Sequence, residues 1–235
     1  MASTASAPPD PGGERLGRLG AEVSECRRCP RLVAWREQVA REKRAAFRDQ
    51  EYWGRPVPGF GDPAAGLLIL GLAPAAHGGN RTGRIFTGDR SGDWLFASLY
   101  RTGFANQPVS VSRDDGLALT GCYITAPVKC APPDNKPLPS ERDTCAPWLA
   151  AELALLDIRV VVALGAFAWD NALHHLGPVR PKPRFGHAAE APLPHDRVLL
   201  GSFHVSQQNT NTGRLTEPML DGVFLRARRL LESSA

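Results

Sequence analysis

The sequence predicts an α/β fold in which a four-stranded parallel sheet is covered by helices on both faces. First, a short apolar segment is followed by an amphipathic segment four times along the chain, the pattern that builds parallel sheets with crossover helices. Second, the segment 160–164 is entirely apolar and begins with three β-branched valines, as expected for a strand at the centre of the sheet. Third, three of the four predicted strands end in loops of small and polar residues. Such loops gather at one edge of a parallel sheet, so a binding site is expected there.

Each predicted strand is a short apolar run, and each predicted helix repeats apolar residues at helical spacing. The strands are expected at 67–70, 122–126, 160–164 and 198–203. The helices that follow them are expected at 94–104, 140–156, 166–176 and 218–231. Before the first strand, helices are expected within 14–47, followed by a Pro/Gly-rich connector at 53–63. Residues 177–196, rich in proline and histidine, are expected to form a long loop.

The composition is that of an ordinary globular protein of 235 residues, and one domain is expected over residues 14–235. Residues 1–13 are rich in Ala, Pro and Gly, lack the apolar core of a secretory signal and are expected to form a disordered tail. No apolar run approaches the roughly 20 residues that cross a bilayer. We therefore expect a cytoplasmic monomer with no membrane partner. The net charge of +4 is compatible with a polyanionic partner but does not demand one.

Four of the five cysteines have a spacing typical of a metal site. Cys26 and Cys29 form a Cys-x-x-Cys pair, and Cys130 and Cys145 lie about 100 residues downstream. Four thiolates without a histidine suit zinc or a [4Fe–4S] cluster, and the spacing does not distinguish them. A redox pair is the alternative for a single Cys-x-x-Cys. Cys122 lies within a predicted strand and is interpreted as a small buried core residue.

Residues 71–89 follow the first predicted strand and form a long loop of glycines and small residues. Such a loop allows the backbone to come close to a flat or charged ligand. Within it, Phe86 offers a stacking face. Asp89 is interpreted either as the N-cap of the next helix, which is the simpler interpretation of a lone carboxylate, or as a group that positions water. The phosphate-binding motifs GxGxxG and GxxxxGK[ST] are both absent from the sequence.

Three other polar residues have both an ordinary and a functional interpretation. Asn135 is either a turn residue or an amide that reads the edge of a base. His204 ends a strand rather than lying on an apolar helix face, which favours a neutral imidazole that donates to a ligand oxygen. His77 is equally well a phosphate contact or a solvent-exposed loop residue.

Three motifs occur in the order expected of a known family. They are Gly71-Leu-Ala-Pro-Ala-Ala-His-Gly-Gly-Asn-Arg-Thr-Gly-Arg with Phe-Thr-Gly-Asp89, Lys129-Cys-Ala-Pro-Pro-Asp-Asn-Lys-Pro137, and His204-Val-Ser-Gln-Gln-Asn-Thr-Asn-Thr-Gly-Arg-Leu-Thr216. Together with the cysteines they resemble family 5 (type B) uracil-DNA glycosylases, from about residue 26 to residue 231. The resemblance implies a three-layer α/β/α fold. It also implies a structural [4Fe–4S] cluster held by Cys26, Cys29, Cys130 and Cys145.

The same resemblance implies monofunctional hydrolysis of uracil from DNA in base-excision repair, by base flipping, leaving an abasic site. Phe86 would stack on the extruded base, and Asn135 would pair with its O4/N3 edge. His204 would stabilise the departing uracil anion, and Asp89 would orient the water. The backbone that would bind the uracil carbonyls comprises Leu72, Ala73, Pro74, Ala75 and Ala76. DNA contacts are expected from His77, Asn80, Arg81, Gln207, Gln208, Asn209, Arg214 and Leu215.

Two details of the motifs refine these expectations. In sister families an acidic or amide side chain follows the Gly-x-Ala-Pro turn, whereas this chain has Ala75-Ala76. We therefore expect a broad glycosylase that also accepts hypoxanthine, ethenocytosine and some mismatched thymine. The segment 205–215 is expected to enter the minor groove, with Leu215, Gln207 or Gln208 as the wedge. Nucleoid association is expected while the protein is on DNA.

Two other functions are compatible with part of the pattern. One is a non-catalytic Fe–S or zinc protein that binds damaged bases or single-stranded DNA. Such a binder would use Phe86, Asn135 and His204 but would have no use for the carboxylate of Asp89. The other is a small-molecule nucleotide hydrolase, which would lack a groove-entering loop. The presence of both features favours the glycosylase.

Overall fold

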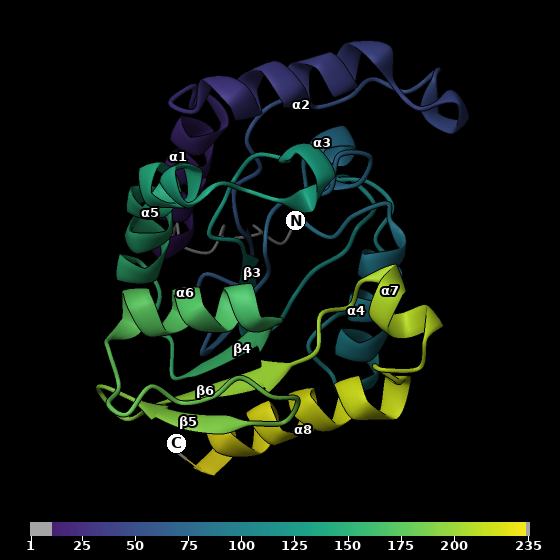
Figure 1. Cartoon of the computed structure of the whole chain (residues 1–235). Helices are drawn as coiled ribbons and strands as arrows, with labels where there is room; N and C mark the ends of the chain where they lie inside the picture. The colour runs from purple at the N-terminus through teal and green to yellow at the C-terminus, as the bar shows by residue number, and fades with distance from the viewer. Residues whose placement is uncertain (1–10, 234–235) are drawn as a thin grey trace, which may run out of the picture.

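A computed structural model describes residues 11–233 of the chain (Figure 1). Residues 1–10 of the expected tail lie outside the described residues, whereas 11–13 belong to helix α1 (Pro11–Ser24). Within residues 11–233 no helix is both long and apolar enough to cross a membrane.

The sheet has six strands in the order β1-β3-β2-β4-β6-β5. The four predicted strands form its parallel centre, at β2 (Leu67–Leu70), β3 (Cys122–Thr125), β4 (Val160–Leu164) and β6 (Arg197–Ser202). Two antiparallel edge strands, β1 (Phe60–Gly61) and β5 (Glu190–Leu193), complete it. The expectation of four strands, with 53–63 as a connector and 177–196 as a loop, is therefore corrected at both edges. β5 contains Pro192, a residue that sheets accommodate at an edge, and β1 is too short to give a sequence pattern.

Helices cover both faces of the sheet, which confirms the three-layer architecture (Figure 1). Alternate residues of β2 face opposite cores: Leu67 and Ile69 pack with one cluster, and Leu68 and Leu70 with the other. α4 (Arg90–Arg101) and α8 (Glu217–Ser233) lie on the first side. α1, α5 (Pro139–Ala154) and α6 (Ala166–Leu176) lie on the second. The strands are buried on both sides, which explains why they are continuous apolar runs.

The remaining helical segments lie among the loops that follow the strands or precede β1. They are α2 (Pro30–Glu42), η1 (Ala45–Phe47), α3 (Gly79–Thr82), η2 (Pro133–Asn135) and α7 (Gln207–Asn211). Because the carboxyl ends of β2, β3 and β6 lie at the same edge of the sheet, the loops that follow them converge there.

Candidate active site and cysteine cavity

The loops after β2, β3 and β6 enclose a cavity of about 620 Å³, which we call the base cavity. Its lining includes Phe86 and Asp89 from the first loop, Asn135 from the second and His204 from the third. The structure thus brings together the four side chains that the sequence singled out, at the edge where they were expected.

The two interpretations of Asp89 are compatible because a carboxylate has two oxygens. It is the N-cap of α4, and its Oδ1 accepts a hydrogen bond from the Gly92 amide at 3.0 Å. Its Oδ2 lies directly against the Cα of Gly78, where any Cβ would collide with it. Burial raises the pKa of the Asp89 carboxyl above its ordinary value, against the lowering effect of the Gly92 and Ser91 amides. The carboxylate is therefore oriented and partly desolvated at the cavity wall.

The ring of Phe86 is held in place by an uncommon backbone conformation and a close contact. Phe86 has a φ of 51°, in the left-handed region that non-glycine residues rarely adopt. Its ring lies so close to Gly71 that a Cβ there would be 2.9 Å from the ring atoms Cε2 and Cζ. The ring is only 8% exposed and lies 6.3 Å from the imidazole of His204. This aromatic face is thus fixed before any ligand arrives.

His204 is neutral in the folded protein. Burial lowers the pKa of its imidazole to about 4, so the ring offers one N–H donor and one acceptor at neutral pH. Its backbone carbonyl accepts a hydrogen bond from Asn209 Nδ2 at 2.8 Å. Asn209, expected to contact DNA, thus uses its amide group to fix the loop that carries His204.

A groove of about 690 Å³ continues from the base cavity and shares part of its lining, including Ala75, Asp89 and Asn135. The groove also has residues that the sequence analysis did not single out: Arg44, Phe47, Gln50, Arg90 and Val111. Of these, Arg44 and Arg90 are exposed cations. The clustering of Arg41, Arg44 and Arg48 in the sequence was the available signal for this wall.

Two expected DNA contacts are wrong because their side chains are fully buried. Asn80 is 0% exposed and donates from Nδ2 to the Arg36 carbonyl at 3.2 Å. Leu215 is also 0% exposed and packs in the core on the α4 and α8 side of the sheet. It therefore cannot act as a wedge from this position.

Some of the other residues expected to contact DNA already make contacts within the protein, and some have exposed side chains. Arg81 lines the groove but donates to the carbonyl oxygens of His77 and Gly88 and stacks on Phe47 at 3.9 Å. His77 lines the groove with Nδ1 3.0 Å from the Tyr52 hydroxyl, and burial lowers its pKa. Those with exposed side chains are Gln207, Gln208 and Arg214.

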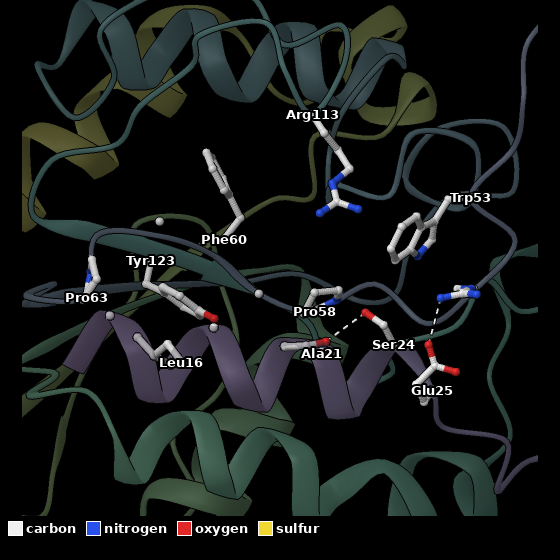
Figure 2. A pocket seen from close by; sticks show the side chains of 16 residues that line it. Leu16, Ala21, Ser24, Glu25, Trp53, Pro58, Phe60, Pro63, Arg113 and Tyr123 are labelled. Atoms are coloured by element: carbon white, nitrogen blue, oxygen red, sulfur yellow. Dashed lines mark hydrogen bonds and ion pairs between the residues drawn. The ribbon is translucent and has the colours of Figure 1, made fainter. Parts of the chain in front are cut away.

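A further cavity, of about 580 Å³, lies between α1 and the β1 region and contains none of the predicted site residues (Figure 2). Its polar lining includes Arg55 and Glu25, which form an exposed ion pair, and Arg113, which lies over the ring of Trp53 at 4.5 Å. Arg55 and Glu25 are paired with each other and Arg113 is stacked on Trp53, so we assign the chemistry to the base cavity.

All four predicted ligand cysteines line a single small cavity, which we call the cysteine cavity. It has a volume of only about 10 Å³ and is also lined by Leu32, Trp148 and other residues. The cysteines are free thiols, and burial raises the pKa of Cys130 to about 12 and that of Cys145 to about 11. Over residues 11–233 no group of His, Cys, Asp or Glu is arranged to hold a single metal ion. A lone zinc would need its thiolates roughly 3.8 Å apart, from Zn–S bonds of about 2.3 Å.

The surroundings of the cysteine cavity are rich in hydrogen-bond donors. Arg36 Nη1 donates to Cys130 Sγ at 3.3 Å, and the Lys129 amide donates to Cys145 Sγ at 3.3 Å. Within the part of the chain that the structure describes, Arg36 Nε and Trp148 Nε1 are buried without a hydrogen-bond partner.

Arg36 is 2% exposed, and the carboxylate in ion-pair range is Glu37 at 3.8 Å, which also bonds Arg27. A buried cation with so weak a counter-ion is costly. The four thiols and these donors therefore fit an anionic group.

Comparisons with known proteins agree with this geometry. A sequence model described as "Uracil DNA glycosylase superfamily" matches residues 58–227. A type-5 uracil-DNA glycosylase of Mycobacterium tuberculosis is 59% identical over 222 residues, which are 93% of this chain and 83% of that protein.

Proteins with the same name from two other organisms are also similar. The one from Thermus thermophilus is 54% identical over 209 residues, covering 88% of this chain and 94% of that protein. The one from Pyrobaculum aerophilum is 48% identical over 202 residues, covering 86% and 87%. The chain therefore belongs to the uracil DNA glycosylase superfamily and, within it, to the type-5 uracil-DNA glycosylases.

Proposed function

We propose that this protein is a monofunctional glycosylase of base-excision repair, which hydrolyses the N-glycosidic bond of uracil in DNA and leaves an abasic site. The observation that carries the proposal is the meeting of a carboxylate and a neutral imidazole, Asp89 and His204, beside the ring of Phe86 in one cavity. Relatives along most of the chain bear the name uracil-DNA glycosylase, which supports the same reaction.

The mechanism begins with the base outside the duplex, since its glycosidic bond is inaccessible in the helical stack. The fixed ring of Phe86 stacks on the extruded uracil, and the amide of Asn135 reads its O4/N3 edge. Backbone amides in 72–76 bind its carbonyl oxygens.

Cleavage of the bond places negative charge on uracil and positive charge on the sugar. Neutral His204 donates an N–H to uracil O2, where the negative charge develops. Asp89 uses the oxygen that does not cap α4 to orient the water and to stabilise the sugar cation.

The absence of a lyase step is supported by the state of Lys129. This lysine is 1% exposed and pairs with Glu152 Oε2 at 2.6 Å. An enclosed, ion-paired ammonium cannot attack the sugar as a free amine. We therefore propose that water, and not this lysine, completes the reaction.

Substrate breadth follows from the methyl side chains near the reacting bond. Ala75 lines the base cavity where sister families carry a polar side chain, and it makes no hydrogen bond to one particular base edge. We propose that hypoxanthine, ethenocytosine and mismatched thymine are also excised, more slowly than uracil.

The test is a cleavage assay on an oligonucleotide that contains one uracil, followed by alkali. Wild-type protein should give alkali-dependent breakage at the uracil. Asp89→Asn should lower the single-turnover rate by about 100-fold, a loss typical of removing one preorganised charge stabiliser. Asparagine caps a helix as well as aspartate does, so the fold of the variant should be intact.

The alternative function, a non-catalytic damaged-base or single-strand DNA-binding protein, gives a different result. It predicts that wild-type protein binds uracil-containing DNA and leaves it uncut, and that Asp89→Asn binds equally well. That outcome would disprove the proposed glycosylase activity.

We also propose that Cys26, Cys29, Cys130 and Cys145 hold a structural [4Fe–4S] cluster, supported by the cavity that they share and by its donors. A cluster with four thiolates is an anion and would act as the counter-charge of Arg36. It would supply cross-links between the connection from α1 to α2, the loop after β3 and α5, and it takes no part in cleavage.

Iron and acid-labile sulfide analysis of protein purified without oxygen tests the cluster. Cys145→Ser should lower iron content and thermal stability, whereas Cys122→Ala, which changes the cysteine outside the cavity, should retain the iron. Stoichiometric zinc without sulfide in the wild-type protein would disprove the cluster.

The partner that we propose is DNA containing uracil or other deaminated bases, bound by a monomer in the cytoplasm. Size-exclusion chromatography with light scattering, with and without DNA, measures the molecular mass and so tests whether the protein is a monomer.

A further inference from the structure

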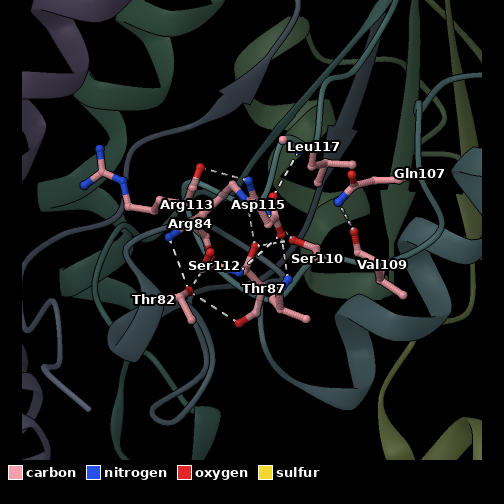
Figure 3. Close-up of polar contacts among 12 residues, drawn as sticks. Thr82, Arg84, Thr87, Gln107, Val109, Ser110, Ser112, Arg113, Asp115 and Leu117 are labelled. Carbon is pink, nitrogen blue, oxygen red and sulfur yellow. Dashed lines mark hydrogen bonds and ion pairs between the residues drawn. The ribbon is translucent and has the colours of Figure 1, made fainter.

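The loop between α4 and β3 is folded around one buried carboxylate. Asp115 Oδ2 accepts hydrogen bonds from the Val111 amide at 2.7 Å and the Ser112 amide at 3.2 Å. Its Oδ1 accepts one from the Leu117 amide at 3.0 Å. Figure 3 shows these contacts converging on Asp115. The backbone of 111–117 is therefore tied to a single side chain.

This carboxylate is bound in turn to the loop of the base cavity. Arg84 Nη2 donates to Asp115 Oδ2 at 2.6 Å, and the two side chains are 4% and 7% exposed (Figure 3). The guanidinium also donates to Ser110 Oγ at 2.6 Å and to Thr87 Oγ1 at 3.0 Å. The Gly88 amide, next to Asp89, donates to the Ser110 carbonyl at 2.8 Å. Hydrogen bonds thus join the 109–117 loop and the loop 71–89 that carries Phe86 and Asp89 into one unit.

The 109–117 loop exposes two apolar side chains, Val109 at 50% and Val111 at 60%. Isolated exposed apolar residues are common and need no explanation by themselves. Val111, however, lines the groove beside Asp89 and Asn135, whereas Val109 does not. Among the described residues, Val111 is the exposed large apolar side chain that lines the groove or the base cavity.

Glycosylases that extrude a base must open the stack and keep it open, and proteins commonly do this with apolar side chains pressed against a base step. Leu215 is buried in the core and cannot serve from its position in this structure. A wedge also requires a fixed backbone, because a mobile loop would yield to the stacked bases.

We propose that Val111 is a DNA-wedging residue, which packs against the base step beside the flipped nucleotide, and that Arg84 and Asp115 are the positioning pair that hold it there. This inference rests on the proposed excision reaction. It adds a second protein element, outside the 205–215 loop, that engages duplex DNA. The groove walls on which the duplex would lie carry the exposed cations Arg44 and Arg90.

The test compares single-turnover excision of uracil from a G·U duplex and from the same strand without its complement. Val111→Ser should lower the rate on the duplex about tenfold and leave the single-strand rate unchanged, because a single strand has no stack to open. Val109→Ser is the matched control, with the same loop and substitution and a similar exposure, and should retain both rates.

Asp115→Asn tests the positioning pair, with melting temperature measured in parallel. It should lower the ratio of duplex to single-strand rate even if the fold is weakened, since weakened folding alone lowers both rates equally. In the double variant with Val111→Ser the loss should be smaller than the sum of the single losses, because both substitutions remove one function.

Three results would overturn the inference: equal duplex rates for Val111→Ser and wild type, an equal loss on both substrates, or an equal loss in Val109→Ser. If wild-type protein cuts neither substrate, the proposed function itself fails, and this result is distinct from the other three.

Discussion

The base cavity and the cysteine cavity lie at two ends of the loop 127–137, which carries Asn135 at one and Cys130 at the other. The base cavity has about 620 Å³ and is bordered by residues in the left-handed region: Phe86 at φ 51°, Asp134 at 53° and Asn135 at 55°. The cysteine cavity has only about 10 Å³, and two of its thiols already accept hydrogen bonds.

Under the proposed roles, this contrast between the two cavities follows from how long each ligand stays, transiently for a base and permanently for a cluster. A site for a transient base must keep polar groups available and must hold its aromatic face in place at some conformational cost. A site for a resident group can surround it with donors and close over it. We therefore expect substitutions near the cysteine cavity to lower stability, and substitutions near the base cavity to lower activity.

The largest expected effect is a loss of stability near the cysteine cavity, at the buried ion pair between Lys129 and Glu152. Glu152 accepts from Lys129 Nζ at 2.6 Å through Oε2, and from the Gly59 amide at 3.0 Å through Oε1. Glu152→Gln leaves the Lys129 charge buried and unpaired, which should lower the free energy of unfolding by about 3–5 kcal/mol. Chemical denaturation and iron content measure this loss.

The matched control for that pair is on the surface. Glu190→Gln removes a salt bridge with Arg226 in which both side chains are 40% exposed, and it should cost at most about 1 kcal/mol. Similar losses for the two variants would contradict the role assigned to the buried pair.

The second-largest expected effect is a loss of activity, rather than of stability, from a substitution at the base cavity. Gly78→Ala places a Cβ against Asp89 Oδ2 and displaces that oxygen from the cavity wall. Excision should fall about 100-fold, a loss like that from removing the carboxylate itself. Gly222→Ala is the control, since no atom lies within 4 Å of its Cβ position in α8, and it should raise helix stability by about 1 kcal/mol. A Gly78→Ala variant with unchanged excision would contradict this placement of Asp89.

The sequence predicts the parallel centre of the fold because each of its strands is buried on both faces, as the run Leu67–Leu70 shows. It also predicts the convergence of the four cysteines and of Phe86, Asp89, Asn135 and His204, because the motifs that carry them are specific. It does not predict β1 and β5, since a two-residue strand and a strand that contains Pro192 have no distinctive pattern.

Residues whose role depends on packing were also missed or misplaced. Leu215 and Asn80 lie within matching motifs, but burial depends on contacts with distant parts of the chain, such as the Arg36 carbonyl. The environment of Val111 depends on the pairing of Arg84 with Asp115, which is 31 residues away. Neither the contact of Asn80 with the Arg36 carbonyl nor the pairing of Arg84 with Asp115 has a local sequence signal.

A third substitution alters only the position of the Phe86 ring, the face on which the base is proposed to stack. Gly71→Ala puts a Cβ 2.9 Å from the Phe86 ring, and overpacking of this kind costs about 1–3 kcal/mol. Because the added methyl group pushes the ring out of its position at the cavity wall, we expect the melting temperature to fall by a few degrees and excision to fall about tenfold. Full activity on uracil together with a lowered melting temperature would show that the ring has only a packing role.

The smallest expected effect is a gain in stability at Asp89, which follows from the cost of keeping a carboxylate in the base cavity. Burial raises its pKa in the folded state, so the folded protein retains this proton at a pH where the unfolded chain has lost it. The resulting loss of stability begins as the pH rises above the unfolded pKa and is complete above the folded pKa. Asp89→Asn should thus be more stable than wild type at neutral pH, and the difference should vanish at acid pH below both values. Unfolding free energies of both proteins across this pH range measure the effect. A variant that is less stable at neutral pH would show that Asp89 serves the fold through its capping charge, and the contrast between the two cavities would then fail at its central residue.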